Sequence, residues 1–324
     1  MDFNTLFQGF NEKKVLIVGD SMIDAYMWGK INRKSPEAPV PVVEVKKHEN
    51  RLGGAANVAL NLKALGAYPI LCSVIGTDEK GVLFEKLMEE SNLSTLGILS
   101  TSKRKTTIKT RIIAENKHQL RIDEEQTSPI LETEEFLKLT ISLINDIDVI
   151  IFQDYNKGVL TRQIIEVVIA SANKKGIPTI VDPKKLNFNS YKNCTIFKPN
   201  LSEIKAGMKI DFDSNNIAEI EKATVKLRKK NSAKGVLLTL SERGICINSE
   251  KGFKHTPAFK RNIIDVSGAG DTVISVASLC LASKMDYRNL SMLSNLAGGI
   301  VCEDVGVVPI NKKKLLIQAL KLIN

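Results

Sequence analysis

The sequence predicts an α/β protein in which a mostly parallel sheet is covered by helices on both faces. Two observations carry this prediction: short apolar runs recur along the chain, and segments with helical spacing lie between several of them. The strand-like runs lie at 15–19, 70–75, 149–152, 179–181, 195–197 and 236–239. The helix-like segments lie at 55–65, 81–91, 161–174 and 273–281. This alternation is typical of parallel sheets buried by crossover helices.

Two segments break the alternation. Residues 39–45 form a proline-punctuated run, and 107–113 with 118–122 read as a hairpin turning at Asn116-Lys117. Both alternate apolar with polar side chains, as strands do when one face meets water. They predict a small sheet outside the main one, built from about 31–48 and 105–123 and acting as a lid or a dimer contact. We expect residues 1–324 to form a single domain, because no linker or internal repeat interrupts them.

Composition excludes several classes of protein. The chain has 324 residues, 43% hydrophobic and 25% charged, as in ordinary globular proteins. We expect no membrane span, because no segment approaches the roughly 20 apolar residues needed. The N-terminus lacks a signal-peptide pattern, which predicts a cytoplasmic protein. The five cysteines are scattered and never form a CxxC pair, so we interpret them as buried thiols in a reducing compartment.

The formal net charge of +10 raises the question of nucleic acid binding. Much of the excess lies in short runs, 226–230 and 312–314, that are typical of solvated helix faces. Aromatic residues make up only 5%, and no basic strand with interleaved aromatics is present. We therefore expect no nucleic acid partner. A basic surface also suits an enzyme whose substrates carry phosphate.

The segment 264–272 is the most informative in the chain. It reads IDVSGAGDT and runs directly into an apolar helical stretch. A small-residue loop at a helix N-terminus favours a bound anion, yet Asp271 would repel a phosphate unless it served another purpose. Taking a proton from an attacking hydroxyl is such a purpose, which points to phosphoryl transfer. The alternative is a tight turn with Asp271 as a helix cap.

Other known phosphate-binding patterns are missing. The P-loop pattern GxxxxGK[ST] is absent, and the first strand is followed by GDSM instead of GxGxxG. The protein-kinase signatures are missing too. Ligands of parallel sheets bind at the carboxyl ends of strands. The polar residues found there, and thereby favoured as site residues, are Asp20, Asp154, Asp182, Asn200 and Ser241.

Four motifs occur together in order: GGAANVA at 53–59, KPNLSE at 198–203, TLSERG at 239–244 and DVSGAGDT at 265–272. In this combination the chain resembles the ribokinase, or PfkB, carbohydrate kinases, from about Val15 to Pro309. The resemblance implies a ribokinase-like fold, with ATP and Mg²⁺ as cofactors. SPEAPVPV at 35–42, with GDSMID at 19–24 and DYNKG at 154–158, is similar to the kinase half of the bifunctional proteins of ADP-heptose synthesis. Those kinases phosphorylate D-glycero-D-manno-heptose 7-phosphate at its anomeric oxygen.

The departures from that pattern are mild. Ser267 stands where Thr is commoner, Gln153 where Ser is usual, and Asn156 replaces a frequent Ala.

We expect no adenylyltransferase half, so a separate adenylyltransferase would complete the pathway. A homodimer through the lid is also expected.

The resemblance also implies roles for individual residues. Asp271 is the expected base, and the backbone N–H groups of Gly268, Ala269 and Gly270 stabilise the transferring phosphoryl group. Asn200 and Glu203 match positions around Mg²⁺ and the ATP phosphates, with Glu203 the expected magnesium residue, directly or through water. The same pair fits a helix capping box. The remaining residues expected on the nucleotide side are Ser202, Thr239, Ser241, Gly244 and Asn295.

The acceptor side is predicted from residue chemistry. Asp24 can accept hydrogen bonds from sugar hydroxyls, Gly53 and Gly54 allow close backbone approach, and Asn57 offers a donor and an acceptor. Asp154 follows a buried strand at the ligand-binding edge. The cations considered for the acceptor's own phosphate are Lys157, which we favour, and Arg33, Arg111 and Lys184. Two alternatives remain: another PfkB kinase, acting on ribose, fructose, a nucleoside or a sugar phosphate, and a non-catalytic sugar-phosphate sensor.

Overall fold

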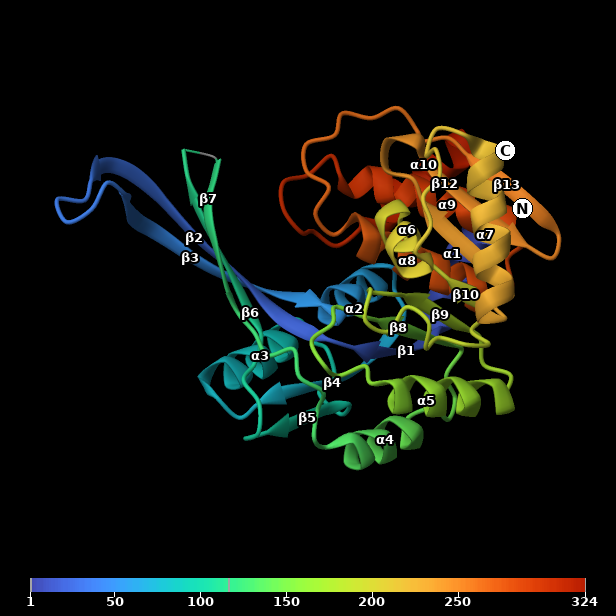
Figure 1. Ribbon diagram of the computed structural model, residues 1–324, viewed down its shortest axis with the longest axis horizontal. Helices are drawn as coiled ribbons and strands as arrows, with labels where there is room; N and C mark the ends of the chain where they lie inside the picture. Colours follow the sequence, from blue (N-terminus) through green and yellow to red (C-terminus); the bar gives the residue numbers. More distant parts are fainter. Residues whose placement is uncertain (1, 116, 324) are drawn as a thin grey trace.

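The computed structural model describes residues 2–115 and 117–323, and its main body is built on a nine-stranded sheet (Figure 1). The strand order is β13-β12-β11-β10-β9-β8-β1-β4-β5, parallel from β5 to β11 and antiparallel at β12 and β13. The strands are β1 (Lys14–Gly19), β4 (Tyr68–Gly76), β5 (Ile98–Thr101), β8 (Val149–Gln153), β9 (Thr179–Asp182), β10 (Ile196–Phe197), β11 (Gly235–Thr239), β12 (Ile245–Ser249) and β13 (Gly252–Thr256). The predicted α/β class is confirmed.

Helices cover both faces of this sheet, as the alternation predicted. They are α1 (Phe3–Gly9), α2 (Ala55–Ala64), α3 (Glu79–Glu90), α4 (Thr133–Ser142), α5 (Arg162–Lys174), α6 (Leu201–Met208), α7 (Ile217–Asn231), α8 (Ala269–Ala282), α9 (Tyr287–Val301) and α10 (Lys312–Leu322), with short 3-10 turns η1 (Phe10–Glu12) and η2 (Ser241–Arg243). Side chains alternate along β1, so that Val15 and Ile17 enter one core while Leu16 and Val18 enter the other.

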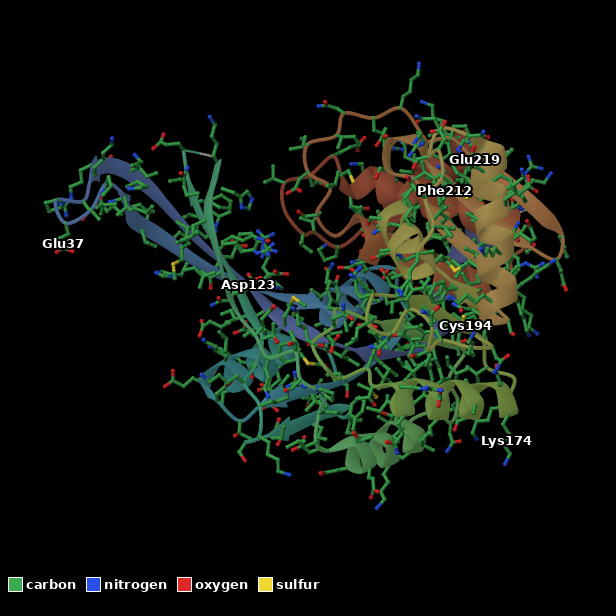
Figure 2. The ribbon with its side chains drawn as sticks, in the orientation of Figure 1. Glu37, Asp123, Lys174, Cys194, Phe212 and Glu219 are labelled. Atoms are coloured by element: carbon green, nitrogen blue, oxygen red, sulfur yellow. The ribbon has the colours of Figure 1, made fainter. Side chains whose placement is uncertain are left out.

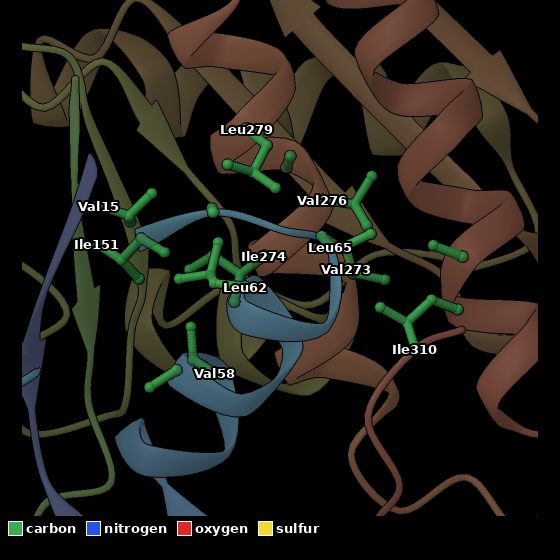
Figure 3. Close-up of a cluster of buried hydrophobic side chains, with 14 of the residues drawn as sticks. Val15, Val58, Leu62, Leu65, Ile151, Val273, Ile274, Val276, Leu279 and Ile310 are labelled. Carbon is green, nitrogen blue, oxygen red and sulfur yellow. The ribbon is translucent and has the colours of Figure 1, made fainter. Parts of the chain in front are cut away.

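The first core joins α1, α2, α3, α8, α9 and α10 to one face of the sheet. In Figure 3, Val58 and Leu62 of α2 lie against Ile274 of α8, with Val15 and Ile151 of the sheet close by. The second core lies under α4, α5, α6 and α7. Helices α2 and α8 carry Asn57 and Asp271, and the first core fixes these two helices against each other.

A separate four-stranded sheet, the lid, projects from the body (Figure 1). Its order is β3-β2-β6-β7, with β2 parallel to β6. The strands are β2 (Ser21–Lys34), β3 (Pro41–Gly54), β6 (Ile108–Ala114) and β7 (Lys117–Glu124). The predicted lid limits were too narrow at the front, because β2 is its central strand and starts at Ser21. Residues 22–26 are all buried, so they do not alternate and gave no strand signal. The expected turn residue Asn116 lies outside the described residues.

Much of the lid faces solvent. Every residue of β7 is exposed, including Leu120 at 58% and Ile122 at 43%. Figure 2 shows side chains standing out on both sides of the lid strands, with Glu37 at the far tip and Asp123 nearer the body. An exposed sheet with apolar side chains is a candidate for covering by another surface.

Two further findings concern the described residues as a whole. None of their helices is long and apolar enough to cross a membrane. The five cysteines are all buried and none forms a disulfide. Burial raises the pKa of the Cys72, Cys194 and Cys246 thiols to about 12.

Candidate active site

Asp271 lies in the first turn of α8 and is 7% exposed. Its Oδ2 accepts a hydrogen bond from Asn57 Nδ2 at 2.7 Å. Its Oδ1 accepts one from Gln153 Nε2 at 3.0 Å and one from the Tyr155 hydroxyl at 2.8 Å. The three donors come from α2, the end of β8 and the loop after β8. Three separate elements therefore fix this carboxylate.

The electrostatics of Asp271 suit a proton acceptor. Burial raises the pKa of Asp271 to about 6, against the lowering effect of the hydrogen bonds from Asn57 and Tyr155. Asp182 raises it further, and Lys198 lowers it. The group is thus ionised at neutral pH and more basic than an ordinary aspartate. A general base works best when its pKa lies near the working pH.

A buried ion pair lies beside the start of α8. Lys198 Nζ is 2.9 Å from Asp182 Oδ2, and both residues are nearly inaccessible. A Cβ placed on Gly270 would be 3.8 Å from Asp182 Oδ2 and 3.9 Å from Lys198 Nζ. Lys198 was not among the predicted site residues, although it opens the KPNLSE motif. Its position directly after the strand-like run 195–197 is the signal in the sequence that could have marked it.

The glycine loop at the start of α8 has the expected shape. Gly268 is the N-cap with φ +78°, a left-handed conformation that favours glycine. The first N–H groups of a helix have no partner within the helix, so they are open to an anion. Of the three residues expected to stabilise the phosphoryl group, Ala269 already donates its N–H to Val266 O at 3.3 Å. Gly270 is therefore the stronger candidate.

Lys184 lies at this end of the site. It forms an ion pair with Glu203, and its Nζ is 5.8 Å from the centre of the Tyr155 ring. Burial lowers the pKa of Lys184, but Asp182 and Glu203 outweigh it and the net shift is upward. Lys184 is among the cations considered above for the acceptor's own phosphate. Its neighbours place it instead beside Asp271 and the KPNLSE motif, where phosphoryl transfer would occur.

Asn200 and Glu203 form the capping box that their spacing allowed. Asn200 Oδ1 accepts from Glu203 N at 2.9 Å, and Glu203 Oε2 accepts from Asn200 N at 2.8 Å. Ser202 Oγ also donates to Asn200 Oδ1, at 2.7 Å. Thr239 lies beside Asn200, since the two form an isolated parallel bridge. The nucleotide-side residues of β11 and α6 thus meet at one sheet edge.

Glu203 brings one carboxylate to this region. No three His, Cys, Asp or Glu side chains among residues 2–115 and 117–323 are close enough to hold a metal by themselves. Mg²⁺ is commonly bound by one or two carboxylates together with substrate phosphates and water. The donor set therefore fits a magnesium ion that arrives with a nucleotide, with Glu203 reaching it directly or through water.

The three residues expected near adenine converge on segment 256–258. A Cβ on Gly244 would lie 2.2 Å from Thr256 O, and the φ of Gly244 is +89°. Asn295 Nδ2 donates to Pro257 O at 2.8 Å. Ser241 begins η2, whose C-cap is Gly244, and it also has a positive φ of 53°.

The acceptor side centres on Asp24 of β2. Arg111 Nη1 lies 2.5 Å from Asp24 Oδ1, and a Cβ on Gly53 would lie 2.2 Å from Asp24 Oδ2. Arg111 and Arg51 both lie over the Tyr26 ring, at 5.4 and 4.9 Å from its centre. Asp24, Arg111 and Gly53 are brought together as predicted, whereas Tyr26 and Arg51 were missed. They lie on the unpredicted strand β2 and its partner β3.

Several predicted acceptor residues have other contacts. Asp154 is fully buried and accepts hydrogen bonds from Asn187 and Tyr191, which indicates a structural role instead of a substrate contact. Arg33 lies near the far end of β2, roughly 30 Å from Asp24 at about 3.3 Å per residue, so its role toward the acceptor stays a prediction. Gly54, with φ +60°, allows the close approach to Asp20 O at the start of α2.

Lys157 lies at the base of the lid and is partly accessible, its side chain being 13% exposed. Its Nζ is 2.6 Å from Glu125 Oε1. Lys109 Nζ lies 2.8 Å from Glu125 Oε2, so two ammonium groups share one carboxylate there. An arriving dianion could be contacted by both lysines.

Comparison with known proteins identifies relatives over most of the chain. The model of the pfkB family of carbohydrate kinases matches residues 12–314. The chain is 40% identical over 314 residues to the bifunctional protein HldE of Desulfatibacillum aliphaticivorans, covering 95% of this chain and 63% of that protein. It is 39% identical over 296 residues to the protein of the same name from Helicobacter pylori strain G27, covering 91% and 64%. The chain thus spans less than two thirds of the length of these relatives.

Solved structures share the fold at low sequence identity. Phosphofructokinase-2 of Escherichia coli in complex with potassium superposes with a TM-score of 0.80 at 16% identity, covering 94% of this chain and 98% of that one. Arabidopsis thaliana ribokinase complexed with ribose and ATP gives 0.73 at 17% identity, with the same coverage. The fold is therefore ribokinase-like. Together with the family match and the relatives at about 40% identity, this shows that the chain belongs to the pfkB family of carbohydrate kinases.

Proposed function

We propose that this chain uses ATP to phosphorylate the anomeric hydroxyl of D-glycero-D-manno-heptose 7-phosphate, giving the 1,7-bisphosphate used in ADP-heptose synthesis. The observation that carries the proposal is the Asp271 carboxylate, fixed by three donors at the start of α8. The choice of heptose depends on the SPEAPVPV segment and on the similarity to the HldE proteins over nearly the whole chain.

In this mechanism Asp271 takes the proton of the anomeric hydroxyl as its oxygen attacks the γ-phosphorus of ATP. Asp24 accepts hydrogen bonds from the sugar, while Arg111 holds its carboxylate in place. The bond from γ-phosphorus to the bridging oxygen breaks, and ADP leaves. The N–H groups at the start of α8 and the Lys184 ammonium stabilise the charge that builds up on the phosphoryl oxygens.

The nucleotide-side residues would hold ATP and its metal. Glu203 and Asn200 are the proposed neighbours of Mg²⁺, which supplies positive charge to the triphosphate when bound. Residues Ser202 and Thr239 line the same edge. Ser241, Gly244 and Asn295 are proposed to form the adenine pocket around segment 256–258.

Lys157 is the proposed contact for the acceptor's own phosphate. Its ammonium is partly accessible and shares Glu125 with Lys109, so that a phosphate entering there meets two cations. We also propose a homodimer formed through the lid, because β7 exposes Leu120 and Ile122. The cytoplasm is the proposed compartment, since it keeps thiols such as these reduced. An adenylyltransferase activity would use the product.

An acceptor panel with ATP and Mg²⁺ tests the substrate. Heptose 7-phosphate is expected to exceed free heptose, ribose and fructose by at least about tenfold in kcat/KM, because a neutral sugar forgoes the charged hydrogen bonds that a phosphate would make with Lys157 and Lys109. Fructose 6-phosphate serves as the control for a general preference for sugar phosphates. If ribose or fructose proves the best acceptor, the heptose assignment is wrong and the kinase assignment stands.

A further inference from the structure

Asp20, which follows β1, accepts hydrogen bonds from the backbone of the loop at 155–159. Its Oδ2 accepts hydrogen bonds from the backbone N–H groups of Tyr155 at 2.8 Å and Lys157 at 3.0 Å. Its Oδ1 accepts one from Val159 N at 2.9 Å. The residue is 1% exposed. One buried carboxylate therefore binds three alternate amides of segment 155–159.

The backbone of this loop is shaped for an anion. Asn156 has φ +54° and Gly158 has φ +90°, so left-handed residues alternate with the three donors. Successive turns of this kind point N–H groups into one concave site. Arg104 Nη2 donates to Lys157 O at 2.6 Å and holds the loop by its carbonyl. Asp20 supplies from within the chain the negative charge that such a site attracts.

The same residue is connected to both oxygens of Asp271. The loop it binds carries Tyr155, whose hydroxyl donates to Asp271 Oδ1 at 2.8 Å. The backbone carbonyl of Asp20 accepts from Ala55 N at 2.9 Å, at the first residue of α2. That helix carries Asn57, which donates to Asp271 Oδ2 at 2.7 Å.

Removing the carboxylate would leave three amide N–H groups without partners in a dry environment, which is costly. Burial raises the pKa of Asp20 to about 6, and Asp154 raises it further, while the three amides lower it. The amides thus stabilise the ionised form at neutral pH in a site that otherwise disfavours charge.

We propose that Asp20 is a positioning residue for phosphoryl transfer: it orders loop 155–159 so that the Tyr155 hydroxyl is held on Asp271. Asp20 touches neither substrate nor nucleotide in this role. The inference depends on the proposed role of Asp271 as the base. Small displacements of catalytic groups lower rates strongly, so the effect is expected in kcat and not in nucleotide binding.

The test compares Asp20→Asn, Tyr155→Phe and the double variant, with heptose 7-phosphate and ATP as substrates. The substituted carboxamide offers one acceptor oxygen in place of two and turns its NH₂ toward an N–H donor. We expect kcat to fall by about tenfold or more with KM for ATP within about twofold of the parent. In the Tyr155→Phe background the same change is expected to lower kcat by less than about twofold, because the two residues act through one contact.

Asp78→Asn is the matched control. Asp78 follows β4 at the same sheet edge and accepts backbone hydrogen bonds from Gly81 and Thr106, but it has no link to Asp271. It should lower the melting temperature and leave kcat within about twofold. Two results would overturn the proposal. One is an Asp20→Asn variant with parental kcat, and the other is a double variant whose loss of kcat equals the product of the losses in the two single variants.

Asn156→Ala covers the case in which Asp20→Asn does not fold. It disfavours the left-handed conformation at position 156 and so disturbs the same loop from its more accessible side. Its kcat should fall, and the fall should disappear in the Tyr155→Phe background; an unchanged kcat overturns the proposal. If the parent enzyme shows no turnover with heptose 7-phosphate, the substrate assignment has failed, and the comparison is repeated on the best acceptor of the panel.

Discussion

The proposed catalytic carboxylate, Asp271, and the lid are built in opposite ways. Asp271, Asn57 and Gln153 are each under 8% exposed and lie on elements fixed by the main sheet and its first core. The lid strand β7 has no buried residue, and its charged side chains pair in solvent. The proposed base is therefore placed before any substrate arrives. The proposed acceptor side, in contrast, depends on ion pairs that a substrate could exchange.

Asp271→Asn is expected to have the largest effect and tests the preformed half of this comparison. The amide is nearly isosteric and leaves the N-terminus of α8 intact, so ATP should still bind. A general base typically contributes 10²–10⁴-fold, so kcat should fall by about that factor. Steady-state kinetics measure the fall in kcat, and an ATP titration measures whether nucleotide binding is retained. Asp286→Asn, which alters the cap of α9, is the control. Turnover within about tenfold of the parent would contradict the role of Asp271.

The pH dependence of kcat/KM is a second test of the proposed role of Asp271. Since burial raises the pKa of Asp271 to about 6, activity should fall about tenfold per pH unit below that value. Asp271 and Asp20 both bind protons more tightly when folded than unfolded, so between about pH 6 and 4 these two groups add stability as pH falls. Carboxylates whose pKa is lowered, such as Asp78 and Glu303, act in the opposite direction, so activity is measured where the protein is still folded. A midpoint near pH 4 would contradict the assignment.

Lys157→Ala tests the acceptor side of the comparison, where ion pairs are proposed to be exchanged for the substrate. Removing this cation should raise KM for heptose 7-phosphate by about tenfold, because a charged hydrogen bond to phosphate is lost, and should barely change KM for ATP. Lys80→Ala, which removes another ion pair near the lid base, with Glu124, is the matched control. An unchanged KM in Lys157→Ala would move the phosphate contact to Lys109 or Arg111.

Hydrogen exchange provides the smallest and most local test. If the lid closes over the sugar, heptose 7-phosphate should slow exchange in β2, β3, β6 and β7 by several-fold more than ATP alone. The second core under α4 and α5 should change little and serves as the internal control. Equal protection of the lid by ATP alone would place these strands outside the acceptor site.

The sequence predicted the main sheet well and singled out Asp271 as the candidate base, because both signals are encoded locally. Apolar runs such as 149–152 are typical of strands buried on both faces. The GAGD motif combines turn, helix start and carboxylate in a few adjacent residues. Asp24 and Arg111 were separate candidates for the acceptor side, and their ion pair was not predicted.

Contacts between distant segments were not predictable in the same way. Tyr155 and Gln153 donate to Asp271 across more than 110 positions of sequence separation, and no spacing rule signals that. The contact of Lys184 with Glu203 was not foreseen, because a lysine after a strand has no encoded direction. The distance of Arg33 from Asp24 was not foreseen either, because the length of β2 was not recognised and strand length sets how far a side chain lies from the body.

The buried thiols make the two cores separately observable. Cys280 lies in the first core, while Cys72, Cys194 and Cys246 lie in the second. Thiols alkylate as thiolates, and burial raises the pKa of each, so labelling requires opening of the surrounding structure. Alkylation rates resolved by peptide mass would therefore report whether the face that carries α2 and α8 opens together with the opposite face or independently of it. The native cysteines thus supply a reporter for the opening of each side of the sheet, with no label introduced.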